Sequence, residues 1–196
     1  MARQTVPVVE CDPTVPSLLR HVAARYGDRA FVATPGVRVS FAGIEAGSRR
    51  LAGALLEAGL VKGTRVAFRF GNGPEWLTLW LALARIGCIS MPLSTMYRPA
   101  ELRQVLALSD AEVFVTPSQL QGADQAELVE QALPGLAQAA PSPLHLKAVP
   151  FLRRVFMVGG DLPVWADPLP EAATDWAETS TWRVWRPRCT HRTRCW

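Results

Sequence analysis

The chain of 196 residues is long enough for one large domain, or for one domain with an appendage. Apolar residues make up 49% of it and charged residues 19%, which allows a sizeable core and excludes a globally disordered protein. The net charge of +4 does not indicate a basic protein surface, because five arginines and no acidic residue lie between Trp182 and Trp196. Of the 21 basic residues, 16 then remain against 17 acidic ones, so the basic character belongs to the C-terminal tail.

The first third of the chain predicts a helix, a hairpin and a second helix. Pro16 to Tyr26 carries an apolar helical stripe. Ala30 to Ala33 and Val37 to Phe41 are β-rich runs around the turn sequence Thr34-Pro35-Gly36. Gly43 to Ala58 has a buried stripe at helical spacing, and Gly59 stands where a left-handed residue would end this helix.

From Arg65 the chain alternates between strands and helices. The predicted strands are Arg65–Phe70, Cys88–Met91, Glu112–Thr116 and Arg154–Val158, and the predicted helices are Pro74–Arg85, Pro99–Leu108 and Ser118–Leu133. This order predicts an α/β fold with a mostly parallel sheet and helices on both faces. We expect residues 135–143 to be a linker and residues 162–174 to be a loop, and the tail after residue 179 has no helical or strand periodicity.

The cellular location follows from three absences. The cysteines show no spacing typical of a disulfide framework, and prolines interrupt any signal-peptide core in residues 1–17. The most apolar run, Trp76 to Leu93, is interrupted by Arg85 and Pro92, which favours a buried helix and strand over a membrane span. We predict a cytoplasmic protein.

A glycine pair offers the first candidate site. Gly71 and Gly73 lie between a predicted strand and a predicted helix, as in a dinucleotide-binding turn. The position of the third glycine of that motif is held by Trp76, so we favour a capped turn with Asn72 or Gly73 as N-cap and Pro74 as the first helical residue.

Two basic residues are further candidates. Lys62-Gly63-Thr64 has the wrong order for a phosphate loop and leads into a strand, which indicates a surface turn. Arg69 is expected at the carboxyl end of a parallel strand, where ligands bind in open α/β sheets, although a paired structural arginine is the favoured interpretation.

The remaining candidates are weaker. Cys189, His191 and Cys195 have irregular spacing for a metal site, and neither His21 nor His145 has an identifiable nucleophile. The Arg- and Trp-rich tail could bind nucleic acid by phosphate contacts and stacking, but an unfolded, non-selected tail is the favoured interpretation.

The order of several short motifs resembles the AMP-dependent synthetase and ligase family, with the closest similarity to acyl-CoA synthetases for fatty or aromatic acids. The similarity covers about three quarters of the chain and matches the first part of a much longer family protein. The motifs are Gly59-Leu60-Val61-Lys62-Gly63-Thr64-Arg65-Val66-Ala67, Gly73-Pro74-Glu75-Trp76, Ala84-Arg85-Ile86-Gly87-Cys88-Ile89-Ser90-Met91-Pro92-Leu93, Arg98-Pro99-Ala100-Glu101-Leu102, Asp110-Ala111-Glu112-Val113-Phe114-Val115-Thr116 and Val155-Phe156-Met157-Val158-Gly159-Gly160-Asp161.

The resemblance implies a two-step reaction in which a carboxylic acid reacts with ATP and Mg²⁺ to give an acyl-adenylate, and coenzyme A then takes the acyl group. In the family a Ser/Thr/Gly-rich phosphate loop follows the segment matched by Val155 to Asp161, and the acid pocket and a lid come later. Residues 160–196 contain no such loop, only Thr179-Ser180-Thr181 before Trp182. No catalytic, cofactor-binding or metal-binding residue of the family can therefore be assigned to a position here.

These observations predict residues 1–178 to be a partial N-terminal adenylation domain and residues 179–196 to be an irregular tail, disordered or produced by a frameshift. The composition supports a frameshift, because 19 arginines against two lysines are typical of GC-rich coding sequences. We expect an N-terminal fragment of an acid–CoA ligase that binds no cofactor and is inactive alone. The alternative is a non-catalytic binding or regulatory module that uses the exposed sheet or the basic tail.

Overall fold

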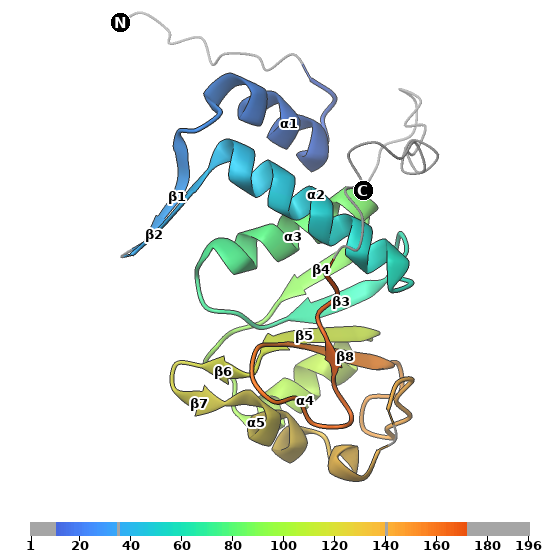
Figure 1. Ribbon diagram of the computed structural model, residues 1–196. Coiled ribbons are helices and arrows are strands. Elements are labelled where there is room, and N and C mark those ends of the chain that lie inside the picture. Colours follow the sequence, from blue (N-terminus) through green and yellow to red (C-terminus); the bar gives the residue numbers. More distant parts are fainter. Residues whose placement is uncertain (1–10, 35, 140, 172–196) are drawn as a thin grey trace, which may run out of the picture.

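The computed structural model describes residues 11–34, 36–139 and 141–171 (Figure 1). The predicted tail and the candidate ligands Cys189, His191 and Cys195 lie outside these ranges.

A parallel five-stranded sheet forms the centre of the molecule. Its strands are β3 (Arg65–Phe68), β4 (Ile89–Pro92), β5 (Val113–Pro117), β8 (Arg154–Val158) and β9 (Asp167–Pro168), in the spatial order β4-β3-β5-β8-β9. Every pairing is parallel, as the alternation of strands and helices predicts. Consecutive residues such as Val66, Ala67 and Phe68 are all buried, because helices cover both faces of the sheet.

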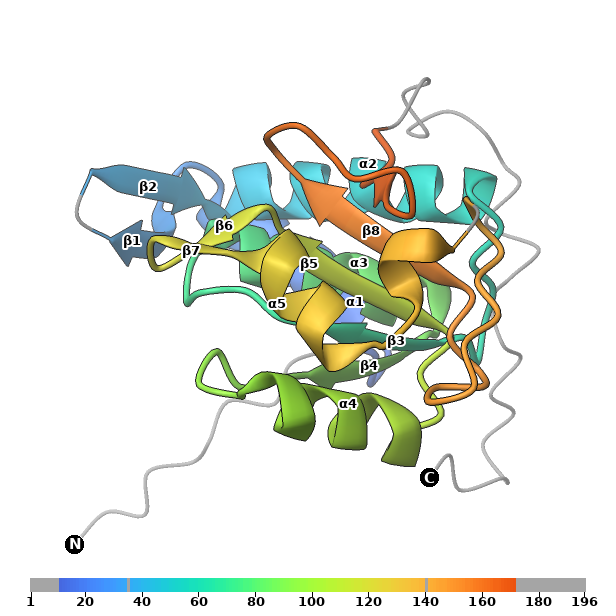
Figure 2. The ribbon, with the colours of Figure 1, turned by 90° about the horizontal axis from the view of Figure 1, so that it is seen from below.

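Two helices pack on each face (Figures 1 and 2). On one face α2 (Phe41–Glu57) and α3 (Pro74–Ile86) bury Leu55, Leu79 and Leu83 against Phe68 and Val115. On the other face α4 (Pro99–Leu108) and α5 (Gln125–Ala132) contribute Leu102, Leu106 and Val129 to a core with Phe114 and Val155. The predicted α/β layers are confirmed.

The N-terminal helix and hairpin lie outside the sheet layers. Helix α1 (Val15–Tyr26) packs on α2 and α3 through Leu19, Ile44 and Leu81. The Thr14 hydroxyl begins this helix by accepting a hydrogen bond from the Ser17 amide at 3.3 Å. Strands β1 (Ala30–Thr34) and β2 (Val37–Ser40) form the predicted antiparallel hairpin, which extends away from the central sheet in Figure 1.

The prediction of one helix over Ser118–Leu133 is wrong in its first part. Short strands β6 (Gln119–Leu120) and β7 (Ala123–Asp124) form a hairpin there, with Gln121 and Gly122 at positive φ in its turn. Helix α5 begins only at Gln125, because the Asp124 carboxylate accepts hydrogen bonds from the amides of Ala126 (2.7 Å) and Glu127 (3.2 Å). This N-cap competes with continuation of the helix in the N-terminal direction.

The predicted loop after β8 also contains structure. Asp167 and Pro168 form β9, the outermost strand of the sheet. Trp165 holds the segment between β8 and β9 against α5. Its side chain is buried, and its indole Nε1 donates a hydrogen bond of 2.8 Å to Glu130 Oε1 on α5. In the predicted linker, a 3₁₀ turn at Leu136–Gln138 buries Leu136. Within the described ranges, no helix is long and apolar enough to cross a bilayer.

Candidate functional site

The carboxyl ends of the five parallel strands meet at one edge of the sheet, which is where open α/β sheets bind their ligands. At this edge, beside the ends of β8 and β9, lies a groove of about 600 Å³. We call it the β8–β9 groove. Its lining residues come from α2, α3, β8, β9 and the segments after the two strands: Gly47, Arg50, Leu51, Thr78, Met157, Val158, Gly159, Gly160, Leu162, Pro168, Leu169, Pro170 and Glu171.

The groove is mostly aliphatic. Among its described lining residues, only Arg50 and Glu171 are charged, and both are exposed. The Thr78 hydroxyl already donates a hydrogen bond of 2.7 Å to the carbonyl of Pro74. Gly159 and Gly160 form the turn that leaves β8, at φ values of 80° and 69°. Such a surface suits an apolar side chain better than a polyphosphate, which needs converging donors and cations.

Arg69 is a structural arginine, as predicted. It follows β3 at the carboxyl edge, and its side chain is buried. The guanidinium donates hydrogen bonds to the carbonyls of Ser94 (3.3 Å), Thr95 (2.6 Å) and Tyr97 (3.5 Å), and to Gln125 Oε1. Burial lowers the pKa of Arg69. Its N–H groups hold the loop after β4 against the start of α5, so the role of Arg69 is structural.

The turn around Gly73 is the predicted helix cap. Gly73 is the N-cap of α3 and Pro74 is the first helical residue. A Cβ on Gly73 would lie 2.9 Å from Glu75 Oε2, so an acidic side chain lies against this turn. The indole of Trp76 packs edge-on against Phe68, with ring centroids 5.6 Å apart. These contacts support the cap and give no support to a dinucleotide site.

The Lys62-Gly63-Thr64 sequence is the predicted surface turn. The Gly63 amide donates to the carbonyl of Gly87 at 2.9 Å, and the Val61 amide donates to Thr64 Oγ1 at 3.1 Å. The turn precedes β3 and therefore lies at the amino edge of the sheet, opposite the groove. Lys147, the other lysine of the chain, precedes β8 and also belongs to that edge.

The described residues do not fit the ATP and Mg²⁺ that the family resemblance implies. Neither lysine is at the carboxyl edge. Among the residues in the described ranges, no group of three or more His, Cys, Asp or Glu side chains could hold a metal ion. His21 lies on α1 and His145 lies in the segment before β8, so the fold does not combine them into a catalytic arrangement.

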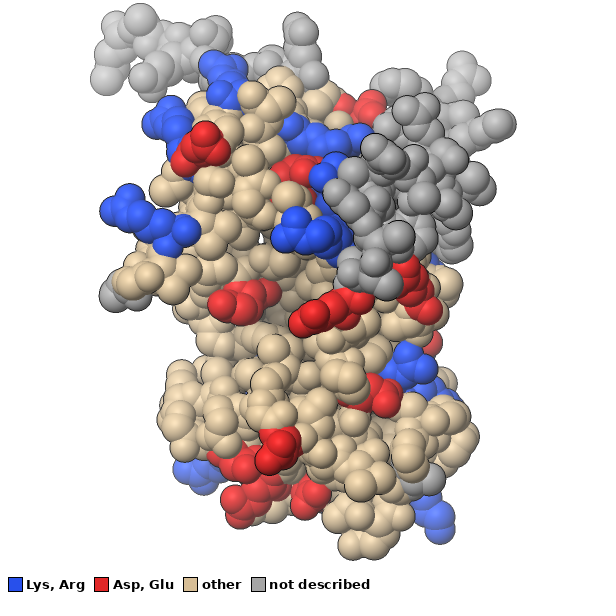
Figure 3. All heavy atoms as spheres, viewed as in Figure 1, with Lys and Arg blue, Asp and Glu red and all other residues tan. Residues whose placement is uncertain are grey.

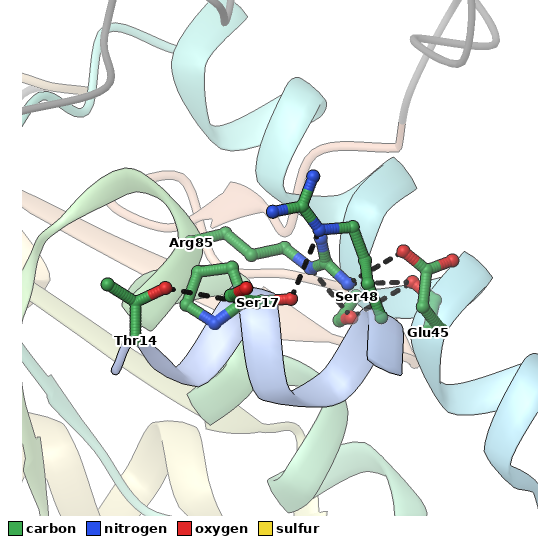
Figure 4. Close-up of polar contacts among 7 residues, drawn as sticks. Thr14, Ser17, Glu45, Ser48 and Arg85 are labelled. Atoms are coloured by element: carbon green, nitrogen blue, oxygen red, sulfur yellow. Dashed lines mark hydrogen bonds and ion pairs between the residues drawn. The ribbon is translucent and has the colours of Figure 1, made fainter. Parts of the chain in front are cut away.

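Sequence reasoning did not identify a polar network between α2 and α3 (Figure 4). Arg85 of α3 forms an ion pair of 3.0 Å with Glu45 of α2, and its Nε donates to Ser48 Oγ at 3.0 Å. Burial is the largest cause that lowers the pKa of Arg85, and Glu45 acts in the opposite direction. This network joins α2 to α3, and Glu45, Ser48 and Arg85 are not among the described lining residues of the β8–β9 groove, so we assign it to the scaffold. No sequence signal could have found it, because the partners are 40 residues apart on different helices.

Comparisons with known proteins agree with the fold. The sequence model described as "AMP-binding enzyme" matches residues 19–176. YngI of Bacillus subtilis, which is named as an acyl-CoA synthetase, is 31% identical over 148 residues, covering 74% of this chain and 27% of YngI. The human mitochondrial medium-chain acyl-CoA ligase ACSF2 is 30% identical over 152 residues, covering 76% of this chain and 25% of the ligase.

Solved structures give the same result. A structure from Rhodopseudomonas palustris, described as a long-chain-fatty-acid CoA ligase, superposes with a TM-score of 0.63 at 28% identity, covering 81% of this chain and 35% of that one. An anthranilate CoA ligase, AuaEII, shares the fold with a TM-score of 0.59 at 17% identity. The chain thus spans about a quarter of the length of the curated relatives it matches. By the extent of the match and by its fold, the chain belongs to the AMP-binding enzyme family.

Proposed function

We propose that the chain is the N-terminal part of an adenylation domain which, in a longer protein, activates a carboxylic acid with ATP and passes the acyl group to coenzyme A. The matches to acyl-CoA synthetases and ligases support this assignment. In this proposal residues 1–178 belong to the domain and residues 179–196 form a separate tail. The proposal covers carboxylic acids of different lengths, since the relatives include proteins named for medium-chain and long-chain acids.

We further propose that these 196 residues do not activate acids by themselves. The observation that carries this proposal is the chemistry of the carboxyl edge. A developing negative charge on phosphate must be met by amide donors, a metal ion and cationic side chains. Among the lining residues that the structure describes, the β8–β9 groove offers one exposed cation, Arg50, and the acidic Glu171. Arg69 stands at the same edge, but its donors are used by four acceptors of the loop and of α5.

An exchange assay tests this proposal. The purified chain is incubated with ATP, Mg²⁺ and labelled pyrophosphate, together with medium-chain, long-chain or aromatic acids, and human ACSF2 serves as the positive control. We expect no acid-dependent exchange with any acid. Acid-dependent label in ATP would show that the chain builds an adenylation site by itself.

A non-catalytic binding module is the alternative. The five arginines between Trp182 and Trp196 favour a polyanion as its partner. This function requires binding to single-stranded nucleic acid that weakens with salt and is lost when Trp182–Trp196 is deleted. Equal retention of the full chain and of the deleted chain on a heparin column would exclude the tail as a binding element.

A further inference from the structure

A second cavity lies between the β1–β2 hairpin and the start of α3. Its volume is about 310 Å³, which is at the lower end of the range of small-molecule sites, roughly 300 Å³. It shares no described lining residue with the β8–β9 groove. We call it the hairpin pocket, and its described lining residues are Val32, Thr34, Asn72, Gly73, Trp76 and Leu77.

Strand β1 forms one wall of the hairpin pocket. Val32 and Thr34 are two positions apart on this strand, so their side chains lie on the same face. Ala33 lies between them on the opposite face and is exposed. The surface between the hairpin and the start of α3 is mostly uncharged (Figure 3). This wall is therefore apolar except for the hydroxyl of Thr34.

The opposite wall carries an aromatic ring in a fixed orientation. The indole of Trp76 packs against Phe68, with ring centroids 5.6 Å apart, and against Trp80, with centroids 6.2 Å apart. Trp76 is only partly buried by these contacts, and it lines the pocket together with Leu77. Because aromatic rings attract one another in stacked and edge-to-face arrangements, this wall suits a flat aromatic ligand.

Asn72 supplies a polar group at the same pocket. Gly73, and not Asn72, is the N-cap of α3, so the Asn72 carboxamide is not used for capping. This side chain is exposed and forms no hydrogen bond with any other described residue. It offers one acceptor and two donors, which a carboxamide on a ligand would match group for group.

The charge at the start of α3 disfavours an anionic ligand. The N-terminus of a helix carries about half a positive charge, but Glu75 in the first turn carries a full negative charge. The Glu75 carboxylate lies against Gly73, since its Oε2 is 2.9 Å from the place of a Cβ there. None of the described lining residues is charged, so no cation among them offsets Glu75. The pocket therefore favours an uncharged ligand over a carboxylate.

From these observations we infer that the hairpin pocket is a binding site for a small uncharged aromatic molecule with a carboxamide group. The ring lies against Trp76 and the carboxamide against Asn72. This inference does not rest on the proposed enzymatic activity, because the ligand is not a carboxylic acid and the β8–β9 groove takes no part in binding it.

Titration with benzamide, followed by NMR of the ¹⁵N-labelled chain, tests the inference. We expect saturable shifts of the Trp76 indole N–H and of the Asn72 side-chain amide. Cyclohexanecarboxamide keeps the amide but lacks the aromatic ring, and should bind about 3-fold or more weakly than benzamide. Benzoate keeps the ring but is negatively charged, and should bind about 5-fold or more weakly.

Three variants locate the site and its charge preference. Thr34→Phe fills the pocket and should abolish the saturable shifts, whereas the matched Ala33→Phe places the same side chain on the opposite face of β1 and should preserve them. Glu75→Gln removes the negative charge and should bring the dissociation constant of benzoate to within about 2-fold of that of benzamide.

A variant at an exposed position keeps the test independent of folding defects. Asn72→Leu removes only the polar partner, and should weaken benzamide about 3-fold or more without weakening toluene, which has no amide. Shifts by benzamide that do not saturate, or that persist equally in Thr34→Phe and Ala33→Phe, would overturn the inference. Tighter binding of benzoate than of benzamide to the unmodified chain would also overturn it.

Discussion

Arg85 of α3 and Glu45 of α2 form an ion pair of 3.0 Å in which the two side chains are only 6% and 14% exposed. Ser48 of α2 lies beside the pair and accepts a hydrogen bond from Arg85 Nε. The two helices that carry this pair cover one face of the sheet and line the β8–β9 groove, so the pair fixes the wall of the candidate site.

Breaking this pair from one side should destabilise the fold strongly. Glu45→Ala leaves a buried guanidinium without its carboxylate, and we expect a loss of about 3 kcal/mol in the free energy of unfolding. The double variant Glu45→Leu with Arg85→Met removes both charges and should recover most of that loss. Urea unfolding of the single and double variants measures this, and equal losses in both would contradict a desolvation penalty.

Arg69 should be essential for the conformation of the loop after β4 and for the stability of the fold. Arg69→Met leaves the carbonyls of Ser94, Thr95 and Tyr97 and the amide oxygen of Gln125 without their donor, which should destabilise the fold by about 3 kcal/mol. Arg69→Lys should recover only part of this, because one ammonium cannot reach four acceptors. Hydrogen exchange in residues 93–98 should rise in both variants.

The control for this series is an arginine on the surface of α4. Arg103 is exposed, and Arg103→Met should change the free energy of unfolding by less than about 0.5 kcal/mol. A loss as large as that of Arg69→Met would mean that arginine content, rather than the contacts of Arg69, sets the stability.

The turn after β8 should not tolerate a side chain at Gly160. Its φ is +69°, and a Cβ there would lie 2.9 Å from Ser118 Oγ. We expect Gly160→Ala to destabilise the fold by about 2–3 kcal/mol, the sum of a left-handed alanine and a steric clash. Gly159→Ala has the same backbone strain but a looser contact of 3.5 Å, and should lose about 1 kcal/mol.

Adding Ser118→Ala to Gly160→Ala removes the Ser118 Oγ atom that would clash with the new Cβ. Thermal unfolding should therefore show a partial recovery in the double variant, while Ser118→Ala added to Gly159→Ala should give none. If the double variant Gly160→Ala with Ser118→Ala showed no recovery, the contact with Ser118 would not contribute to the destabilisation by Gly160→Ala.

Cys88 should be an unreactive thiol. Burial, with a smaller contribution from Glu112, raises the pKa of Cys88 to about 12, and its Sγ donates to the carbonyl of Val61 at 3.4 Å. Because the raised pKa favours the protonated form, the thiolate appears only as the pH approaches 12. In a background of Cys11→Ser, Cys189→Ser and Cys195→Ser, iodoacetamide at pH 8 should label the folded chain at least about 100-fold more slowly than the urea-unfolded chain. Equal rates would show that the thiol is accessible and ionised.

Local patterns determined most of the elements. The apolar stripe before Gly59, the start of α3 at Pro74 and the β1–β2 hairpin each depend on interactions within a few residues, which the sequence contains in full. The alternation of strands and helices also determined the parallel sheet, because each crossover must return to the same edge. Family membership followed from the order of the same segments.

Contacts between segments that are distant in the sequence could not be predicted from local patterns. Asp124, the last residue of β7, caps α5 and so interrupts the helix predicted from Ser118, and Trp165 packs into the core with α5 two residues before strand β9. The cavity at the carboxyl edge exists only because α2, α3, β8 and β9 meet there. The sequence by itself determined the layers and their order, through short-range propensity and periodicity. The tertiary structure alone decided that Arg69 and Arg85 serve the fold and that the groove is apolar, because burial and hydrogen-bond partners depend on residues tens of positions apart.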